Sequence, residues 1–375
     1  MKQQQLILRS VKDIPGGKDT SVDLVLGFGQ KALLESSDFY AGLRAVYPEA
    51  TIALGSSAGE IHGTEVDDGG LSLLMLSFDG TRLRHHGVDI NDHPDSAAAG
   101  RAVVGDLLED DLRHVFLLSD GSLVNGSELV AGIRSVLPDR ISVTGGLAGD
   151  GAAFDYTLVG LNEPPRRGRI AAIGLYGDKL RVAHGTSGGW EPFGLVRTVT
   201  KSKHNELFEI GHKSALEVYK RYLGKHAEAL PGSALLFPLS ILLEDGRHLV
   251  RTILSIDEER QSMIFAGDIP EGSRVRFMMA NQDRLTHAAG IAARRALDSL
   301  DGTTPEVAIL VSCVGRKLVL GDRVEEEVEA VRNVFGPQTA LSGYYSYGEL
   351  APLTEGGGCA LHNQTMTITC LSETD

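Results

Sequence analysis

Three tyrosines crowd into a short glycine-flanked stretch, GYYSYGE, that ends in a carboxylate. The chain has only nine tyrosines, so the grouping of Tyr344, Tyr345 and Tyr347 needs a physical reason. Their rings can form flat walls, and their hydroxyl groups can donate or accept hydrogen bonds. The stretch therefore predicts one wall of a ligand pocket.

The same pocket is expected to include residues at neighbouring strand ends. Arg316 follows one predicted strand, Glu349 follows another, and His362 and Asn363 open the strand directly after the tyrosine loop. Strand ends cluster along one edge of a parallel or mixed sheet, which predicts that these side chains meet in the C-terminal half. The structural alternative is that Glu349 only caps its own loop and that the tyrosines fill a domain seam.

A glycine loop followed by an acid occurs three times, as GSSAGE, GGLAGD and GYYSYGE, and the acids are Glu60, Asp150 and Glu349. Glycine permits positive φ and close backbone approach, and an acid beside it can cap the loop's own N–H groups or face a ligand. We expect two of the three acids to cap their loops and at least one to meet a ligand.

Two motifs point toward catalysis. Cys313 ends a buried-looking strand, and His362 is its best candidate base, which would make a thiol nucleophile. The alternative is that Cys313 is a small buried residue that packs well. Ser57 in GSSAG occupies the nucleophile position of G-x-S-x-G, but a strand follows it where that motif requires a helix. A serine hydrolase is therefore not expected.

The overall composition limits the classes of partner. The chain has 36 basic and 50 acidic residues, and its net charge of −14 disfavours nucleic acid and anionic membrane surfaces. The N-terminal residues turn polar early, and no apolar run approaches the roughly 18 residues of a membrane span. Three cysteines without a CxxC pair encode neither a disulfide framework nor a thiolate zinc site. We therefore expect a cytoplasmic protein.

The elements around these motifs follow one repeated order. Short β-branched runs alternate with amphipathic stretches, and a strand, helix, strand, glycine–acid loop and strand recur from residues 22, 114 and 306. This predicts an α/β fold of two domains built from such units, with mixed sheets. The expected segments are an N-terminal segment at 1–21, a domain at 22–200 and a domain at 201–375. Trp190, in a glycine-rich loop near the boundary, either plugs the domain seam or lines the ligand site.

Several of these motifs together resemble the FIST sensory proteins. They are GSSAGEI, TGGLAGDGAAF, GGWEPFG, VTKSKHNELFEI, VSCVGR, and the closing pair GYYSYGELAP and LHNQT. The resemblance runs in order along nearly the whole chain, over both the N-terminal and the C-terminal FIST parts. It implies a bacterial signal-input protein for a small ligand rather than a catalyst, with a separate protein as its partner.

The resemblance also suggests two ligands. A subgroup of stand-alone FIST proteins binds haem, senses nitric oxide and regulates a histidine kinase, and a haem here would need an axial histidine, either His362 or His287 on an alanine-rich helix. Amino acids are the other ligand proposed for FIST modules. Glu349 would then pair with the ammonium group and Arg316 with the carboxylate, between the tyrosine rings.

Overall fold

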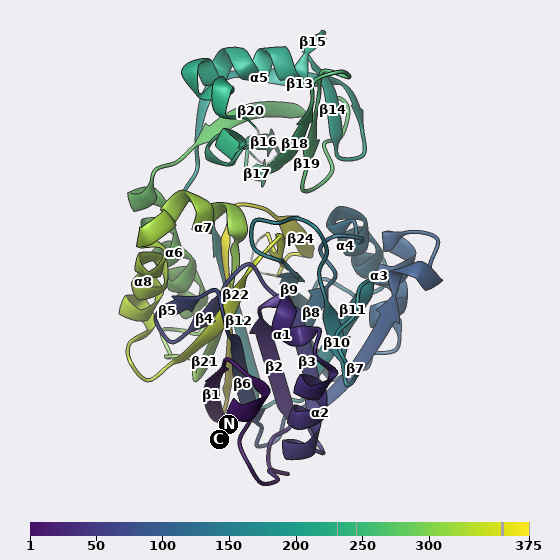
Figure 1. Cartoon of the computed structure of the whole chain (residues 1–375), viewed down its shortest axis with the longest axis vertical. Helices are drawn as coiled ribbons and strands as arrows, with labels where there is room; N and C mark the ends of the chain where they lie inside the picture. The colour runs from purple at the N-terminus through teal and green to yellow at the C-terminus, as the bar shows by residue number, and fades with distance from the viewer. Residues whose placement is uncertain (231, 245, 354–355, 375) are drawn as a thin grey trace.

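The computed structural model describes residues 1–230, 232–244, 246–353 and 356–374. The chain forms two lobes (Figure 1). The large lobe contains both chain ends and consists of residues 1–190 and 280–374, and the small lobe consists of residues 191–279. The predicted α/β class with mixed sheets and repeated units is confirmed.

Three mixed sheets make up the large lobe. In spatial order, the first contains β1 (Lys2–Leu8), β6 (Leu71–Ser77), β2 (Leu24–Gly29), β3 (Thr51–Ser56) and β10 (Val159–Leu161). The second contains, in the same sense, β24 (Cys359–His362), β23 (Gly348–Pro352), β9 (Ser142–Leu147), β8 (Leu112–Ser119), β11 (Arg169–Tyr176) and β7 (Arg82–Asp89). The third contains β12 (Leu180–Ser187), β25 (Met366–Glu373), β21 (Val307–Cys313), β22 (Ala340–Ser346), β4 (Glu60–His62) and β5 (Glu65–Asp67).

The three sheets repeat one pattern of strand pairing. In each, two successive strands of a unit pair in parallel: β2 with β3, β8 with β9, and β21 with β22. The returning strand, β6, β11 or β25, then pairs antiparallel on the other side of the first strand. The three glycine–acid loops therefore lie in related settings, each directly after the second parallel strand.

The strands that follow these loops are exchanged between units. The β4–β5 hairpin leaves the first unit and pairs with β22 of the third, with Ile61 opposite Gly343. The β23–β24 hairpin leaves the third unit and pairs with β9 of the second, and β10 leaves the second unit and pairs with β3 of the first. The exchange is cyclic, so each sheet is completed by a strand from another unit.

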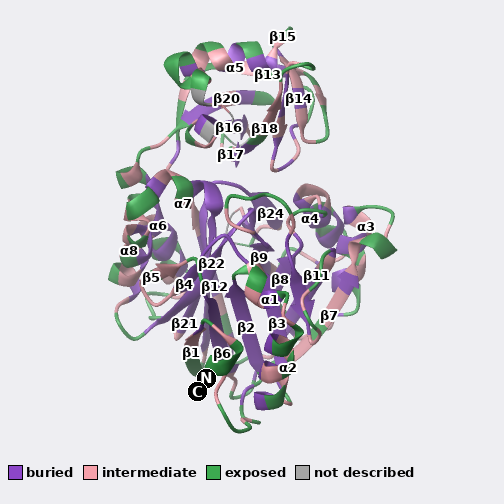
Figure 2. Ribbon diagram, in the orientation of Figure 1, coloured by how far each residue is buried: buried purple, intermediate pink, exposed green. Residues whose placement is uncertain are grey.

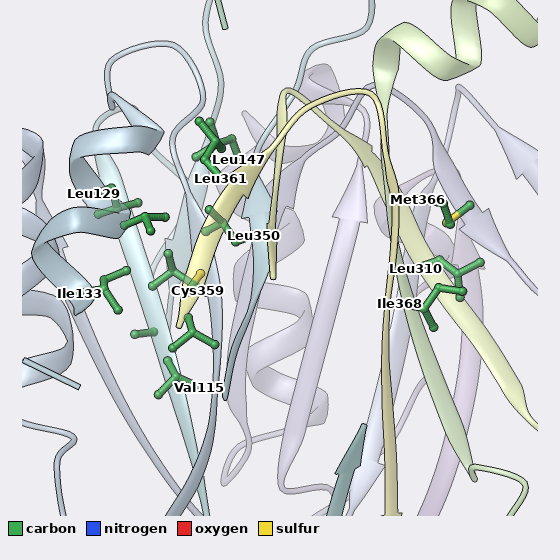
Figure 3. Close-up of a cluster of buried hydrophobic side chains, with 14 of the residues drawn as sticks. Val115, Leu129, Ile133, Leu147, Leu310, Leu350, Cys359, Leu361, Met366 and Ile368 are labelled. Atoms are coloured by element: carbon green, nitrogen blue, oxygen red, sulfur yellow. The ribbon is translucent and has the colours of Figure 1, made fainter. Parts of the chain in front are cut away.

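The hydrophobic core extends across these exchanged strands. Figure 3 shows Leu350, Cys359 and Leu361 of the β23–β24 hairpin beside Leu147 of β9 and Leu129 of the neighbouring helix. All five side chains are buried in one cluster. The strands of the large lobe are mainly buried, whereas the helices keep exposed outer faces (Figure 2).

Helices cover the outer faces of the sheets. They are α1 (Lys31–Leu34), α2 (Ser37–Val46), α3 (Ser96–Gly105), α4 (Gly126–Arg134), α6 (Gln282–Asp298), α7 (Val314–Leu320) and α8 (Glu325–Phe335), with 3₁₀ turns η1 (Val11–Asp13), η2 (Ile90–Asp92) and η5 (Gly321–Arg323). Side-chain caps begin several of them. Asn125 accepts the N–H groups of Ser127 and Glu128 at the start of α4, which satisfies two donors that the helix leaves free.

The small lobe is an antiparallel sheet packed against a helix. Its elements are β13 (Glu191–Lys203), β14 (Glu206–Ile210), β15 (Lys213–Ser214), α5 (Ala215–Leu223), η3 (Gly224–Ala229), η4 (Gly232–Leu236), β16 (Leu239–Leu242), β17 (His248–Arg251), β18 (Ile253–Asp257), β19 (Ser262–Phe265) and β20 (Arg274–Met279). The chain enters on β13 and leaves on β20, and Glu191 is the pairing partner of Met279. The predicted segment 201–375 thus contributes most of the small lobe and the third unit of the large lobe.

Trp190 lies in the seam between the lobes. It packs with Val250 and Met278 of the small lobe and with Leu285 and Leu320 of the large lobe. Its indole Nε1 donates a hydrogen bond of 2.8 Å to the carbonyl of Gln364. Trp190 therefore plugs the seam, which is the first of the two roles considered for it.

Candidate functional site

A cavity of about 640 Å³ lies where the three units of the large lobe meet. Its walls come from the segments after four strands: residues 30–32 after β2, 57–60 after β3, 150–153 after β9, and α7 with its following turn after β21. These are the carboxyl ends of strands in mixed sheets, where α/β proteins commonly bind ligands. The glycine–acid loops of the first and second units both reach it.

Glu60 is the buried acid of this cavity. Glu60 is 2% exposed. Its backbone pairs with that of Tyr344 in β22. Ser57 Oγ donates to Glu60 Oε1 over 2.5 Å. The N–H of Gly70 also approaches the carboxyl group and favours its ionised form, although Oε2 makes no hydrogen bond of good geometry among the described residues. Burial raises the pKa of Glu60 to about 8, because a charged carboxylate is costly where water is excluded.

Asp150 is the second acid of the cavity, and it is fully paired. Its carboxylate accepts hydrogen bonds from the hydroxyl of Tyr347 and, over 3.1 Å, from Lys31 Nζ. The N–H groups of Asp155 and Tyr156 also donate to it. Burial opposes ionisation, but these donors hold the pKa of Asp150 below its usual value. Asp150 therefore stays charged and fixes Lys31 in the cavity wall.

Lys317 supplies a second ammonium group. It lies on α7, and its Nζ donates over 2.8 Å to the carbonyl of Ala58 and pairs with the carboxylate of Asp68. The Asp68 side chain is 73% exposed, so water screens this ion pair and a ligand could replace it. Gly59 leaves the room that Lys317 needs, since a Cβ there would lie 2.4 Å from Nζ.

The cavity thus combines two groups suited to a ligand with opposite charges. Glu60 offers a carboxyl oxygen without a hydrogen bond of good geometry among the described residues, and Lys317 offers an ammonium group whose protein partner is exposed. Lys31 is held by Asp150. A bound ammonium would favour the ionised form of Glu60, because an opposite charge lowers a carboxyl pKa.

Arg316 and Tyr345 of the predicted tyrosine pocket belong to a different, closed network. Arg316 Nη2 pairs with Glu327 over 2.6 Å, and both side chains are completely buried. Tyr345 and Ser312 donate to the other oxygen of Glu327 over 2.7 and 3.0 Å. Arg316 also donates to the carbonyls of Gly188 and Leu285. Its hydrogen bonds therefore stabilise the fold by connecting separate segments of the chain.

Glu349 is paired inside the protein, mainly with the segment that follows β24 rather than with the N–H groups of its own loop. It accepts hydrogen bonds from Ser346 Oγ and from the N–H and hydroxyl of Thr365, over 2.8 to 3.1 Å. Burial raises its pKa to about 7. Tyr344 is also fully buried and stacks on Phe28, with ring centroids 4.4 Å apart. Glu349 and Tyr344 are therefore part of the buried core of the large lobe.

Tyr347 is the predicted tyrosine that reaches a cavity. Its hydroxyl donates to Asp150, and its ring stacks on Phe154 with centroids 4.8 Å apart. Both rings line a cleft of about 390 Å³, which the small lobe closes with residues such as Asn205 and Phe265. Tyr347 therefore lies between the cavity lined by Glu60 and Asp150 and the cleft between the two lobes.

Cys313 and His362 do not form an activated thiol. Burial raises the pKa of the Cys313 thiol far above its usual value, so the nucleophilic thiolate is strongly disfavoured. His362 is also buried, its pKa is lowered to about 4, and Nε2 lies 3.1 Å from the carbonyl of Ala351. The neighbouring Asn363 is buried, and its amide atoms have no partner within the part of the chain that the structure describes.

The two histidines considered as haem ligands do not have haem-binding surroundings. A haem ligand projects into an enclosed apolar pocket. His362 approaches the backbone of Ala351, and His287 is exposed along an open groove on α6. Across the described residues, no three His, Cys, Asp or Glu side chains gather as a metal site. Neither His362 nor His287 therefore has surroundings that fit a haem.

Lys31 and Lys317 were missed by the sequence analysis because each is a single lysine at the start of a helix. The signal for Lys31 was its position in GFGQKA, directly after a buried strand. The signal for Lys317 was its place in VGRK after another such strand. Neither pattern states that the two strand ends face one cavity.

Comparison with known proteins gives two family matches. The FIST N domain model matches residues 23–213, and the FIST C domain model matches residues 215–352. No curated protein matches the chain. In the part of the chain that the structure describes, no helix is long and apolar enough to cross a membrane.

Proposed function

This chain belongs to the FIST family, and we propose that it is a sensor that binds a small ligand and regulates a separate signalling protein. FIST domains are small-ligand-binding signal-input domains. The regulated partner that we propose is a histidine kinase or another signalling protein in the cytoplasm. No catalytic step is assigned, because burial keeps the Cys313 thiol protonated and His362 approaches a backbone carbonyl instead.

The proposed ligand is a free amino acid or a similar zwitterion, bound in the cavity where the three units meet. The observation that carries this proposal is the buried carboxyl group of Glu60, a residue of that cavity's wall, whose Oε2 makes no hydrogen bond of good geometry among the described residues although the N–H of Gly70 lies near the carboxyl group. A buried acceptor without a well-formed hydrogen bond is costly, so a ligand ammonium that reaches it gains a strong charge-assisted hydrogen bond. This moves the amino-acid site from Glu349 and Arg316 to Glu60 and Lys317.

The carboxylate of the ligand would meet Lys317 in place of Asp68. Lys317 keeps its hydrogen bond to the carbonyl of Ala58, and Asp68 is free to turn into solvent. Lys31 stays paired with Asp150 and closes the opposite wall. Two charged anchors at fixed positions favour a ligand that carries an ammonium and a carboxylate together.

The test measures ligand binding to freshly purified protein and to paired variants. Mass spectrometry of the native protein identifies any co-purified metabolite, and thermal shift with single amino acids identifies others. Glu60→Gln and Lys317→Met remove one anchor each. Glu65→Gln, on the same hairpin, and Lys179→Met are controls, because both residues are exposed and lie outside the cavity wall.

We expect Glu60→Gln to weaken calorimetric binding at least about thirtyfold, which is the lower range for losing one partner of a buried charge pair. Lys317→Met should weaken it about tenfold, and both controls should bind like the wild type. Unchanged binding in both cavity variants would place the ligand elsewhere. A Soret band in the absorption spectrum would instead show that the chain binds haem, and a shift of that band on addition of nitric oxide would identify nitric oxide as the signal.

A further inference from the structure

The helix α7 turns one face toward the ligand cavity. Val314, Lys317 and Leu318 on α7 and Gly321 directly after it all line the cavity, at a spacing of i, i+3, i+4 and i+7. Lys317, the proposed anchor for the ligand carboxylate, therefore shares its helix face with two apolar side chains. A carboxylate held by Lys317 would place the rest of the ligand beside Val314 and Leu318.

Leu318 is an apolar side chain that this helix face leaves uncovered. It is 43% exposed, whereas Val314, one turn earlier, is 4% exposed. An exposed leucine on a convex surface is common, but Leu318 lines a concave one. Val324, which follows in the same wall, is half-buried. An apolar group of the ligand that covered Leu318 would gain free energy by leaving water.

Small residues from other parts of the wall leave room beside this helix face. Ala32 comes from α1, and Ala152 and Ala153 come from the loop after β9. A Cβ on Gly151 or Gly321 would meet nothing within 4 Å, so open space lies at both positions. The cavity of about 640 Å³ therefore has space for a ligand side chain of several carbon atoms.

The other charged groups of the cavity wall disfavour a charged side chain on the ligand. Lys31 pairs with Asp150 over 3.1 Å, and this carboxylate also accepts two backbone N–H groups. Asp68, displaced by the ligand carboxylate, is exposed to water. Among the described residues of the wall, a charged ligand side chain would find no buried, unpaired group of opposite sign, and it would lose water on entry.

We propose that the ligand of this cavity carries an aliphatic side chain of leucine size, which packs on Leu318 and Val314. The inference rests on the proposed function for the zwitterionic part of the ligand, which Glu60 and Lys317 would hold. Selection then comes from the apolar area that the side chain removes from water. Leucine, isoleucine and methionine fit this description, whereas alanine is too short, and glutamate and lysine are charged.

The test is calorimetric titration of the full-length protein with single compounds. Alanine, 2-aminobutyrate, valine and leucine form a series of growing side chains, and serine, glutamate and lysine are the polar comparisons. The compound 4-methylpentanoate, which is leucine without its ammonium group, probes the apolar wall separately from Glu60. Leu318→Gln introduces a polar side chain of similar size that also favours a helix. Leu108→Gln, at a position that is 41% exposed and outside the cavity wall, is the matched control. Circular dichroism checks that each variant is folded.

We expect leucine to bind at least about tenfold more tightly than alanine, because its additional carbon atoms leave water. Serine, glutamate and lysine should bind more weakly than leucine. Leu318→Gln should lower the ratio of leucine affinity to alanine affinity about fivefold, since part of the apolar contact is lost. The Leu108→Gln protein should keep the wild-type ratio. A polar amino acid as the best ligand, or an unchanged ratio in Leu318→Gln, would overturn the proposal.

The same titrations separate this inference from the proposed function. A polar amino acid that binds best, and that needs Glu60 and Lys317, would keep the zwitterion site and remove the aliphatic specificity. Binding of 4-methylpentanoate that Leu318→Gln weakens, without binding of any amino acid, would support the apolar wall and remove the amino-acid ligand. If none of these compounds binds, both proposals are wrong.

Discussion

Two buried glutamates, Glu60 and Glu349, keep their protons at a pH where exposed carboxyls lose them. Both follow a glycine loop, and both accept a hydrogen bond from a serine three residues earlier, Ser57 or Ser346. Burial is the main cause of their raised pKa values, about 8 and about 7. In the unfolded chain the pKa of each carboxyl returns to its ordinary value of 4.5.

These shifts predict that the protein loses stability as pH rises. Between the unfolded and folded pKa values the native state binds more protons, so each glutamate lowers the free energy of unfolding by up to about 1.4 kcal/mol per pH unit. The contribution is complete below pH 4.5 and is lost as pH passes the folded pKa, about 7 or about 8. Urea unfolding of wild type and Glu349→Gln from about pH 5 to about pH 8.5 measures it.

The comparison with the variant is essential because buried histidines act in the opposite direction. Burial lowers the pKa of His114 to about 3 and of His362 to about 4, so their contribution rises with pH up to about 6.5. Glu349→Gln should therefore be less stable than the wild type near pH 5 and approach it near pH 8.5. A constant difference across this range would mean that Glu349 is ionised in the native state.

The sequence predicted the three acidic residues that follow glycine loops, but it did not predict which lysines lie near them in the cavity. The glycine–acid pattern identified Glu60, Asp150 and Glu349 and allowed either a capping or a ligand role. Glu349 accepts hydrogen bonds from Thr365, which lies 16 residues later in the loop after β24. Lys31 and Lys317 reach the cavity from units far apart in the chain, and a local pattern does not state which helix starts will face each other.

Two of the three parallel strand pairs depend on glycine at an equivalent position. Gly145 in β9 and Gly343 in β22 face Leu117 and Leu310 of the adjacent parallel strand. A Cβ on Gly145 would lie 1.9 Å from the carbonyl oxygen of Leu117, and one on Gly343 would lie 1.8 Å from that of Leu310. Each glycine also has positive φ, 132° and 157°.

Alanine at either glycine should therefore separate the central strands of its sheet. We expect the free energy of unfolding to fall by at least about 3 kcal/mol, because both the contact and the backbone angle become unfavourable. Gly105→Ala is the control, since it lies on α3 with nothing within 4 Å of its Cβ. It should leave stability unchanged or raise it by up to about 1 kcal/mol. Equal stability of all three variants would contradict the assigned strand pairing.

The local order of elements was predictable, whereas the exchange of strands was not. Buried runs and amphipathic stretches identify β8, α4 and β9 by their residues alone. The β23–β24 hairpin carries the same alternation whether it pairs with its own unit or with β9. What selects β9 is packing of Leu350 and Leu361 against Leu147, a contact between residues about 200 positions apart.

At the scale of the whole molecule, the small lobe is inserted into the large lobe. Its two connections are adjacent, because Glu191 pairs with Met279 across neighbouring strands. Replacing residues 191–279 by a short glycine–serine linker should therefore leave a folded large lobe. We expect a cooperative thermal transition and native-like circular dichroism from this deletion protein.

An N-terminal fragment, residues 1–213, should not fold. It contains every strand of the first unit but lacks β22, which pairs with β4, and β23, which pairs with β9. We expect a chain without a cooperative transition. A stable fragment together with an unfolded deletion protein would reverse this division of the molecule.

The pairing of Ile61 with Gly343 also determines how long β4 waits for its partner strand while the chain is synthesised on the ribosome. The partner strand of β4 is synthesised about 280 residues later, and at about 5 to 20 residues per second this leaves a wait of roughly 15 to 60 seconds. During that time an apolar edge of the first unit has no neighbour. We therefore expect the N-terminal strands to need protection by chaperones most. That need ends when the C-terminal strands that pair with them have been synthesised.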